Sequence, residues 1–183
     1  MSRKYKFGEK DGAYFISFAT VNWIDVFIRD DYFSEITASL DYCRREKGME
    51  IYGYCIMPSH VHLIFRSSLG DPSGLMRDFK GFTSKKLLKA IEENPQESRK
   101  EWLLWMFERA GLKNSNVKQK QFWQQHNQPI EIWSLKVFEQ KLNYIHQNPV
   151  KAGFVEKEED WINSSAGDYY GIRKGAVEII IIE

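Results

Sequence analysis

The sequence predicts an α+β fold, a ferredoxin-like (RRM-like) antiparallel sheet with helices on one face, followed by an additional helix near the C-terminus. Stretches typical of a strand, a helix, two strands and a helix follow one another between residues 13 and 94. With one further strand, this order is that of the split βαβ arrangement. A second observation is an amphipathic stretch that begins at Ser134 and has helical spacing. The third is size, because 183 residues with 43% hydrophobic residues can bury one sizeable core.

The first half of the chain supplies most of the predicted sheet and its helices. Three stretches rich in β-branched and aromatic residues predict strands, and they are 13–21, 50–56 and 60–66. Two stretches in which apolar residues recur every three or four positions predict helices, and they are 30–47 and 71–94. Asp30 and Asp71 suit the N-termini of these helices, and Pro95 ends the second one.

The second half is predicted to hold two more helices and some extended chain. Residues 96–110 and 134–148 have helical spacing, with Ser134 as the N-cap of the second helix. Pro149 should then force the chain out of that helix. Three segments predict extended structure, and they are 121–125, 130–132 and 177–182, the last as an edge strand.

Composition indicates one domain over residues 1–183 and excludes several classes of protein. Cys43 and Cys55 lie far apart and match no metal-ligand spacing, so we expect buried, reduced thiols. The basic N-terminus has no apolar run behind it, and no stretch approaches the roughly 18 apolar residues of a membrane span. We therefore expect a soluble, cytoplasmic protein that has no membrane partner.

The distribution of charge is more informative than its total of +1. Residues 1–10 carry a balance of +3, residues 72–125 a balance of +5, and residues 150–183 a balance of −3. A basic middle and an acidic tail are compatible with a face that follows a phosphate backbone, although solvated helix faces give similar numbers. The candidate phosphate contacts are Arg77, Lys80, Lys85, Lys86, Lys89, Arg3, Lys4 and Lys6.

His60 and His62 form the first candidate site. Alternate side chains of a strand point to the same face, so the two imidazoles should lie side by side. Such a pair can hold one divalent cation, although two partly exposed histidines on a strand would give the same pattern. His146 is interpreted as structural, and His126 has no assigned role.

Tyr144 and Asn148 form the second candidate site, four residues apart on one face of the predicted helix 134–148. An ordinary phenol, with a pKa near 10, is a weak nucleophile at neutral pH, but its phenolate attacks phosphodiesters. A cation held by His60, His62 and the Asn148 amide oxygen would draw off charge from the attacked phosphate. A packing role for the tyrosine and a helix-end role for the asparagine are the alternatives.

Two segments, MPSHVHLI at 57–64 and YIHQNPVKAGFV at 144–155, resemble the IS200/IS605-like Y1 (HUH) transposases. They are most similar to the branch called REP-associated tyrosine transposases. The resemblance covers about residues 10–170 and includes Trp161 with Ser164-Ser165-Ala166. It implies a core over that range, an insertion at about 94–116 and a C-terminal extension at about 171–183.

The resemblance also implies roles for the candidate residues. His60 and His62 match the metal pair of that family, with Mg²⁺ or Mn²⁺ as the metal. Tyr144 matches the nucleophile that forms a 5′-phosphotyrosine and frees a 3′-hydroxyl, and Asn148 matches the position of a third polar ligand. The expected function is metal-dependent cleavage and rejoining of single-stranded or hairpin DNA, by a monomer or a homodimer. The alternatives are a hairpin-binding protein that does not cleave, and a metal-dependent phosphoesterase that uses water.

Overall fold

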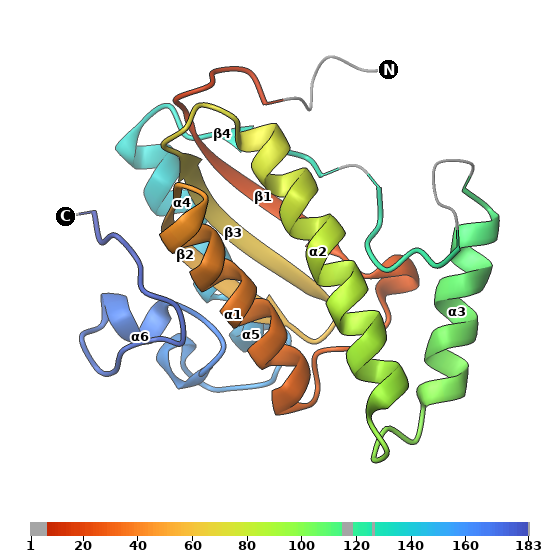
Figure 1. The fold of residues 1–183 in the computed structure, drawn as a ribbon. Helices are drawn as coiled ribbons and strands as arrows, with labels where there is room; N and C mark the ends of the chain where they lie inside the picture. Colours follow the sequence, from red (N-terminus) through yellow and green to blue (C-terminus); the bar gives the residue numbers. More distant parts are fainter. Residues whose placement is uncertain (1–6, 115–118, 126, 183) are drawn as a thin grey trace.

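The structure is a computed structural model that describes residues 7–114, 119–125 and 127–182 (Figure 1). Its strands are β1 (Ala13–Ala19), β2 (Met49–Met57), β3 (His60–Ser67) and β4 (Ile130–Glu131). Its α-helices are α1 (Asp30–Glu46), α2 (Pro72–Glu93), α3 (Lys100–Leu112), α4 (Leu135–His146), α5 (Asn148–Lys151) and α6 (Ala166–Tyr169). Two 3₁₀ turns are η2 (Val21–Trp23) and η3 (Glu158–Asp160). The predicted α+β class is confirmed.

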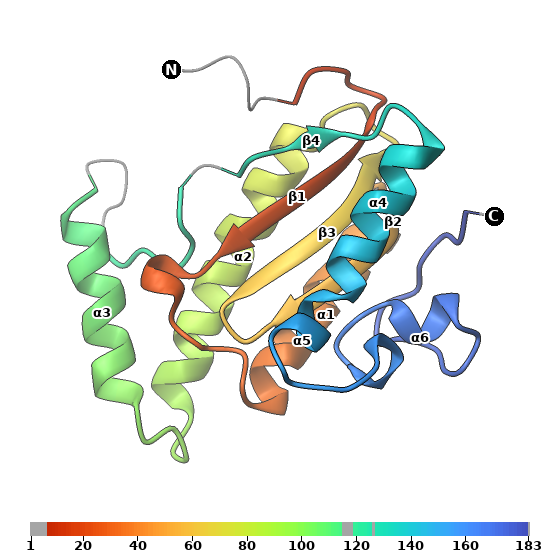
Figure 2. The ribbon, with the colours of Figure 1, turned by 180° about the vertical axis from the view of Figure 1, so that it is seen from behind.

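The four strands form one sheet in the order β2-β3-β1-β4, and each neighbouring pair is antiparallel. Helices α1 and α2 cover one face, whereas α4 and α5 lie on the other (Figures 1 and 2). Successive side chains of β3 point alternately to these two faces of the sheet. Val61, Leu63 and Phe65 belong to the main core beneath α1 and α2, while Ile64 belongs to a smaller core with Ile145 of α4. Helices therefore cover both faces, and the second face carries the late helix.

Local sequence explains where the helices begin. Asp71 caps α2 by accepting a hydrogen bond from the Gly74 amide (2.8 Å). Ser134 caps α4 as predicted, because its hydroxyl accepts from the Val137 amide (3.3 Å). No helix in the described part of the chain is long and apolar enough to cross a membrane.

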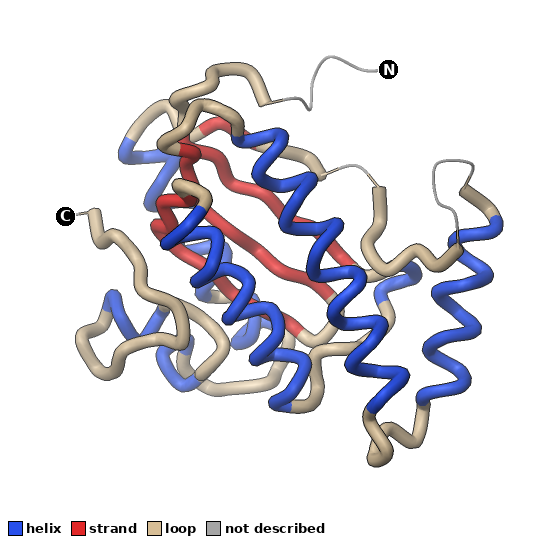
Figure 3. Tube along the Cα trace, in the orientation of Figure 1, coloured by secondary structure: helices blue, strands red, loops and turns tan. Residues whose placement is uncertain are grey.

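The extended segments of the second half are shorter than predicted. Residues 121–125 make only an isolated bridge, between Trp123 and Thr20, because they pass the end of β1. Residues 177–182 form no strand and run as a loop (Figure 3), with one backbone hydrogen bond from Ile180 to Ile51 (2.8 Å). The edge of β2 that this tail would need is occupied near Cys55 by Ser164 and its neighbours.

The end of the late helix also differs from the prediction. Helix α4 ends at His146, two residues earlier than expected. Pro149 does not lead the chain into an extended segment, because it occupies the first turn of α5, where a missing amide hydrogen costs nothing. Gln147 between the two helices keeps helical dihedral angles (φ −76°, ψ −10°), so the chain turns little there.

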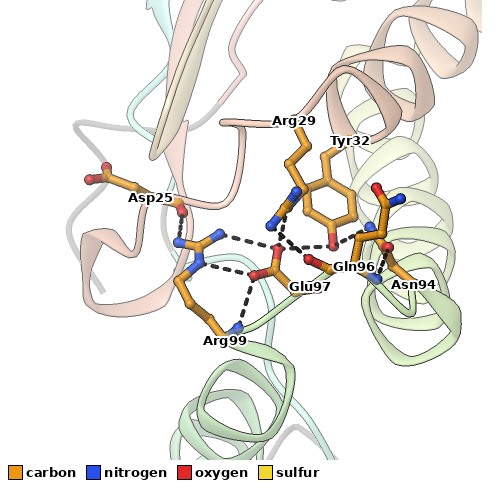
Figure 4. Close-up of polar contacts among 7 residues, drawn as sticks. All are labelled: Asp25, Arg29, Tyr32, Asn94, Gln96, Glu97 and Arg99. Carbon is orange, nitrogen blue, oxygen red and sulfur yellow. Dashed lines mark hydrogen bonds and ion pairs between the residues drawn. The ribbon is translucent and has the colours of Figure 1, made fainter.

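A buried carboxylate fixes α3 beside the rest of the molecule (Figure 4). Glu97 lies in the link between α2 and α3, and its side chain is fully buried. It accepts hydrogen bonds from Arg29 (3.1 Å) and from Tyr32 (3.2 Å) at the start of α1. It also pairs with Arg99 (3.1 Å), whose guanidinium donates to the backbone oxygen of Asp25 (2.7 Å). The cluster thus ties α1, the α2–α3 link and the segment before α1 together.

We expect Glu97→Ala to lower the free energy of unfolding by about 2–3 kcal/mol, because Arg29 and Arg99 lose their buried partner. For a chain of this size, Tm should fall by roughly 5–10 °C. Burial raises the pKa of Glu97, but Arg99 and Arg29 outweigh it and lower the pKa from 4.5 to about 2. The carboxylate therefore stabilises the fold above about pH 4.5, and this contribution is lost as the pH falls toward 2.

Thermal unfolding from neutral pH down to about pH 3 measures this, and the difference between wild type and Glu97→Ala should narrow as the solution becomes acidic. Glu93→Ala is the matched control, since Glu93 is 65% exposed in its pair with Lys89 and should matter by no more than about 0.5 kcal/mol. A difference that is constant with pH would contradict the prediction.

Candidate active site

The two histidines lie side by side at the start of β3. A two-residue turn, Pro58-Ser59, delivers His60 from β2 to β3, and the turn is pinned because the Thr20 amide donates to Ser59 O (2.9 Å). The ring centroids of His60 and His62 are 4.7 Å apart, with the rings nearly perpendicular. Both rings are on the α4 face of the sheet, where His62 lies parallel to the Phe15 ring at 5.9 Å. The spacing predicted from the strand is therefore present.

His62 is buried without a hydrogen-bond partner. Its side chain is 3% exposed, and neither ring nitrogen is hydrogen-bonded within the described residues. Burial, followed by the nearby charge of His60, lowers the pKa of His62 to about 3. Burial also lowers the pKa of His60, against smaller raising effects of Asn148 and Asp25. Both imidazoles are thus neutral near pH 7, which is the form that binds a metal.

Tyr144 of α4 lies directly against this pair. Its ring is 5.4 Å from the His62 ring and 5.8 Å from the Phe15 ring, with edge-to-face geometry in both contacts. The side chain is 44% exposed, so solvent and substrate can reach it. The imidazole pair and the phenol, which are 82 residues apart in sequence, therefore meet within one chain.

Asn148 joins the same group from the start of α5. Its Nδ2 donates a hydrogen bond to the backbone oxygen of Tyr144 (3.1 Å), which leaves the amide oxygen as its remaining polar atom. The amide is close enough to His60 and His62 to favour the protonated form of each, and so to raise the pKa of both against the effect of burial. Asn148 is thus beside both histidines, although it is no longer part of the helix that carries Tyr144.

This donor set fits a divalent cation. The described residues contain no group of three or more His, Cys, Asp or Glu side chains that could hold a metal. Two neutral imidazoles and an amide oxygen are nevertheless suitable ligands that leave positions open for substrate. The two buried ring nitrogens of His62 support this fit, because an unpaired polar atom is costly unless something else binds it.

Three further side chains surround the site, and sequence reasoning missed them. Phe15 packs against both His62 and Tyr144, and Trp23 lies edge-on to His60 at 5.3 Å. The ammonium of Lys141 is 5.1 Å from the Phe15 ring centre and 6.0 Å from that of Tyr144. Lys141 could have been identified from its place one turn before Tyr144 on the same helix face. Phe15 and Trp23 carry no such signal.

The predicted phosphate contacts between residues 77 and 89 are on the other face of the sheet from Tyr144, because they belong to α2 (Figures 1 and 2). Arg77, Lys85 and Lys89 line a groove of about 1210 Å³ between α2 and the segment 119–125. Lys86 lines a separate groove between α1 and α2, where its ammonium is 5.8 Å from the Phe82 ring. The structure therefore divides the predicted cluster into two surfaces.

Lys80 lines the same groove as Arg77 but differs from the other candidates, since it is half-buried and already bonded to the protein. Its ammonium donates to Gln124 O (2.9 Å) and to Asn127 Oδ1 (2.7 Å), and burial lowers its pKa to about 8. Arg3, Lys4 and Lys6 lie outside the described residues.

The remaining histidines and the cysteines play no visible part in the site. His146 is buried on another side of α4, and its Nε2 is hydrogen-bonded to Ser165 Oγ (2.8 Å), as expected of a structural residue. His126 lies outside the described residues. Cys43 and Cys55 are buried and free, as predicted.

Comparisons with known proteins show what the chain is similar to in sequence and in fold. A sequence model of the family described as "Transposase IS200 like" matches residues 14–107, a range that contains the histidine pair and ends before Tyr144. The chain is 24% identical over 156 residues to a protein of Haemophilus influenzae named as a REP-associated tyrosine transposase, covering 85% of this chain and 80% of the relative. The fold is similar to that of a REP-associated tyrosine transposase solved with a REP hairpin, with a TM-score of 0.65 and 19% identity, covering 100% of this chain and 94% of that chain.

Proposed function

The chain belongs to the IS200-like transposase family, and from this premise we propose that it cleaves and rejoins single-stranded DNA beside a hairpin through a covalent bond to Tyr144. The observation that carries the proposal is the contact between the Tyr144 and His62 rings, 5.4 Å apart within one chain. A family member needs a nucleophile and a cation on the same phosphate, and this contact brings their candidates together. The similarity to a transposase solved with a REP hairpin supports the choice of DNA.

In the proposed reaction the Tyr144 hydroxyl oxygen attacks the scissile phosphorus, and the phenolic proton is lost to solvent. A new bond forms between that oxygen and phosphorus while the bond to the 3′-oxygen breaks. The 3′-oxygen takes up a proton and leaves as a hydroxyl, and the 5′ end stays on the enzyme as a phosphotyrosine. Reversal by a 3′-hydroxyl rejoins the strand without ATP, since the covalent bond keeps the energy of the phosphodiester.

The residues around Tyr144 support each part of this step. The Lys141 ammonium is 6.0 Å from the centre of the Tyr144 ring, so it adds a positive charge that can offset the charge of the attacked phosphate. His60, His62 and the Asn148 amide oxygen would hold Mg²⁺ or Mn²⁺, which supplies charge neutralisation at the phosphate. Phe15 fixes the angle between the phenol and His62 by packing against both rings. All of these groups come from one chain, so we propose that a monomer is competent.

The test is a search for the covalent adduct. Protein and a labelled DNA hairpin with a single-stranded 5′ flank are incubated with Mn²⁺, denatured and separated on a gel. We expect labelled protein, and peptide mass spectrometry should place the nucleotide on the α4 peptide that contains Tyr144. Cleavage without an adduct would instead indicate a phosphoesterase that uses water. Binding without cleavage would indicate a hairpin-binding protein.

The groove along α2 is proposed as the surface for the hairpin phosphates, and it predicts a change in salt dependence. Lys85→Ala and Lys89→Ala should each weaken binding and reduce the slope of log affinity against log salt by about one unit. Lys86→Ala is the matched control, because Lys86 is on the same helix but lines a different groove. Fluorescence anisotropy over a salt series measures all three, and an equal effect of Lys86→Ala would contradict this surface.

A further inference from the structure

A second cavity, distinct from the histidine site, lies between α3 and the turn after β1. Its volume is about 860 Å³, and it is lined by residues of η2, α3 and the segment 121–125. The lining includes one exposed aromatic ring, two cations and several amide side chains, and no carboxylate among the described residues. Among the lining residues are Trp23, Arg109, Lys113, Gln124 and Gln125. Neither the family match nor the proposed cleavage chemistry gives this cavity a role.

Trp23 lines this cavity, and its backbone is strained. Its backbone and that of Asn22 both have φ of 55°, a left-handed conformation that asparagine tolerates but that is strained for a bulky residue such as tryptophan. The Trp23 side chain is nevertheless 57% exposed, so burial of the ring does not repay the strain. The turn is held rigidly, because Val21 N donates to Phe122 O (2.8 Å) and Trp23 N to Thr20 O (3.1 Å). An indole held rigidly in solvent is suited to stack on a planar ligand.

The opposite wall is held equally firmly. The amide of Gln121 donates to Phe107 O in α3 (2.9 Å), and the backbone of Gln119 passes so close to Gly111 that a Cβ there would be 2.2 Å from its oxygen. At the other end, the buried Glu97 cluster fixes the start of α3, and Arg99 reaches the Asp25 backbone (Figure 4). Arg109 is on the cavity side of α3, with its guanidinium 5.2 Å from the Trp105 ring. Both walls are thus in place before a ligand arrives.

The position of the cavity connects it with the proposed reaction. Trp23 contacts the His60 ring at 5.3 Å, so one side of its indole borders the histidine pair. Gln121, Gln124 and Gln125 line this cavity and also the basic groove of α2. The cavity therefore lies between the proposed hairpin surface and the proposed cleavage site. A single DNA strand that runs from the hairpin surface to the cleavage site would pass through this cavity.

We propose that this cavity binds an unstacked base of the single strand next to the cleaved phosphate, an inference that rests on the proposed function. Trp23 stacks on the base, Arg109 and Lys113 bind the adjoining phosphates, and the amide of Gln125 contacts the base edge. Stacking on an aromatic ring combined with cations along the backbone is the usual way to hold single-stranded nucleic acid. The predicted insertion at about 94–116 then has a purpose, because α3 and its C-cap residue form the wall that carries both cations.

The experiment measures binding to two probes without metal, so that no cleavage is required. One probe is a DNA hairpin with short randomised single-stranded flanks, and the other is the same hairpin without flanks. We expect wild type to prefer the flanked probe, and Trp23→Ala to lose roughly tenfold or more of its affinity for that probe alone. Trp23→Phe should keep most of the preference. Trp102→Ala is the control, because Trp102 is an exposed tryptophan of α3 that does not line the cavity.

A photocrosslink gives a second readout. An iododeoxyuridine moved along the flank should crosslink to Trp23 from one position and should fail to do so in Arg109→Glu. The inference is overturned if wild type shows no preference for flanks, or if Trp23→Ala binds the flanked probe as wild type does. It survives a failure of the cleavage proposal if the flank preference depends on Trp23 while no DNA is cut. Loss of hairpin binding by wild type would overturn both proposals.

Discussion

Tyr144→Phe is expected to bind hairpin DNA as tightly as wild type and to leave it uncut, with cleavage reduced by at least about 10³-fold. The substitution removes one oxygen atom, the one that would form the bond to phosphorus. It keeps the aromatic ring, whose contacts with Phe15 and His62 are made by ring edges and faces. Since Tyr144 is 44% exposed, the free energy of unfolding should change by no more than about 0.5 kcal/mol.

The measurement is a single-turnover cleavage assay with Mn²⁺, read on a denaturing gel together with the covalent adduct. Tyr42→Phe is a matched control, because Tyr42 is a similarly exposed tyrosine (48%) on α1, beyond the opposite face of the sheet. It should cleave at the wild-type rate. Cutting by Tyr144→Phe at that rate would show that the nucleophile is another group, such as water.

The parts of the fold that periodicity controls could be predicted from the sequence. The strand at 60–66 predicted that His60 and His62 share a face, because that follows from a repeat of two residues. The spacing of Tyr144 and Asn148 predicted their proximity, and this holds even though α4 ends at His146, because Gln147 stays helical. In both cases the relevant geometry is local, within one turn or one strand.

What could not be predicted depends on contacts between distant segments. Phe15 belongs to the site because β1 pairs with β3 in a register that places Ser17 opposite His62, and no local pattern encodes that register. Lys80 was predicted as a phosphate contact from its charge alone, yet Gln124 and Asn127, far away in sequence, accept hydrogen bonds from two of its three ammonium donors. The hydrophobic periodicity of α2 and α4 likewise could not predict that the two helices lie on opposite faces of the sheet.

His62→Leu is expected to abolish cleavage, by at least about 10³-fold, without destabilising the protein. The two buried ring nitrogens of His62 have no hydrogen-bond partner, so the folded state bears the cost of removing them from water. Replacement by an apolar side chain removes that cost, and the neighbours Phe15 and Ile64 are apolar. Without metal, the free energy of unfolding should be unchanged or higher by about 1 kcal/mol.

A divalent cation should make the wild type more stable than the His62→Leu variant. If His62 is a ligand, Mn²⁺ binds the folded wild type and raises its Tm as the Mn²⁺ concentration rises. At a hundredfold excess over Kd, the gain in free energy of unfolding is about 2.7 kcal/mol. The His62→Leu variant should show no such rise, because one of the two imidazoles is gone. Thermal unfolding with and without Mn²⁺ measures both effects on the same samples.

His146 provides the contrasting case, since it is a buried histidine of the same chain whose pKa is likewise lowered by burial, to about 4. Its Nε2 is hydrogen-bonded to Ser165, so His146→Leu breaks a satisfied pair and should destabilise the fold by about 1–3 kcal/mol. Its response to Mn²⁺ should remain that of wild type. If both leucine variants lose stability alike and neither alters the response to Mn²⁺, His62 is a packing residue. A buried imidazole without partners would then have no chemical reason to be there, and the cleavage mechanism would lose its cation site.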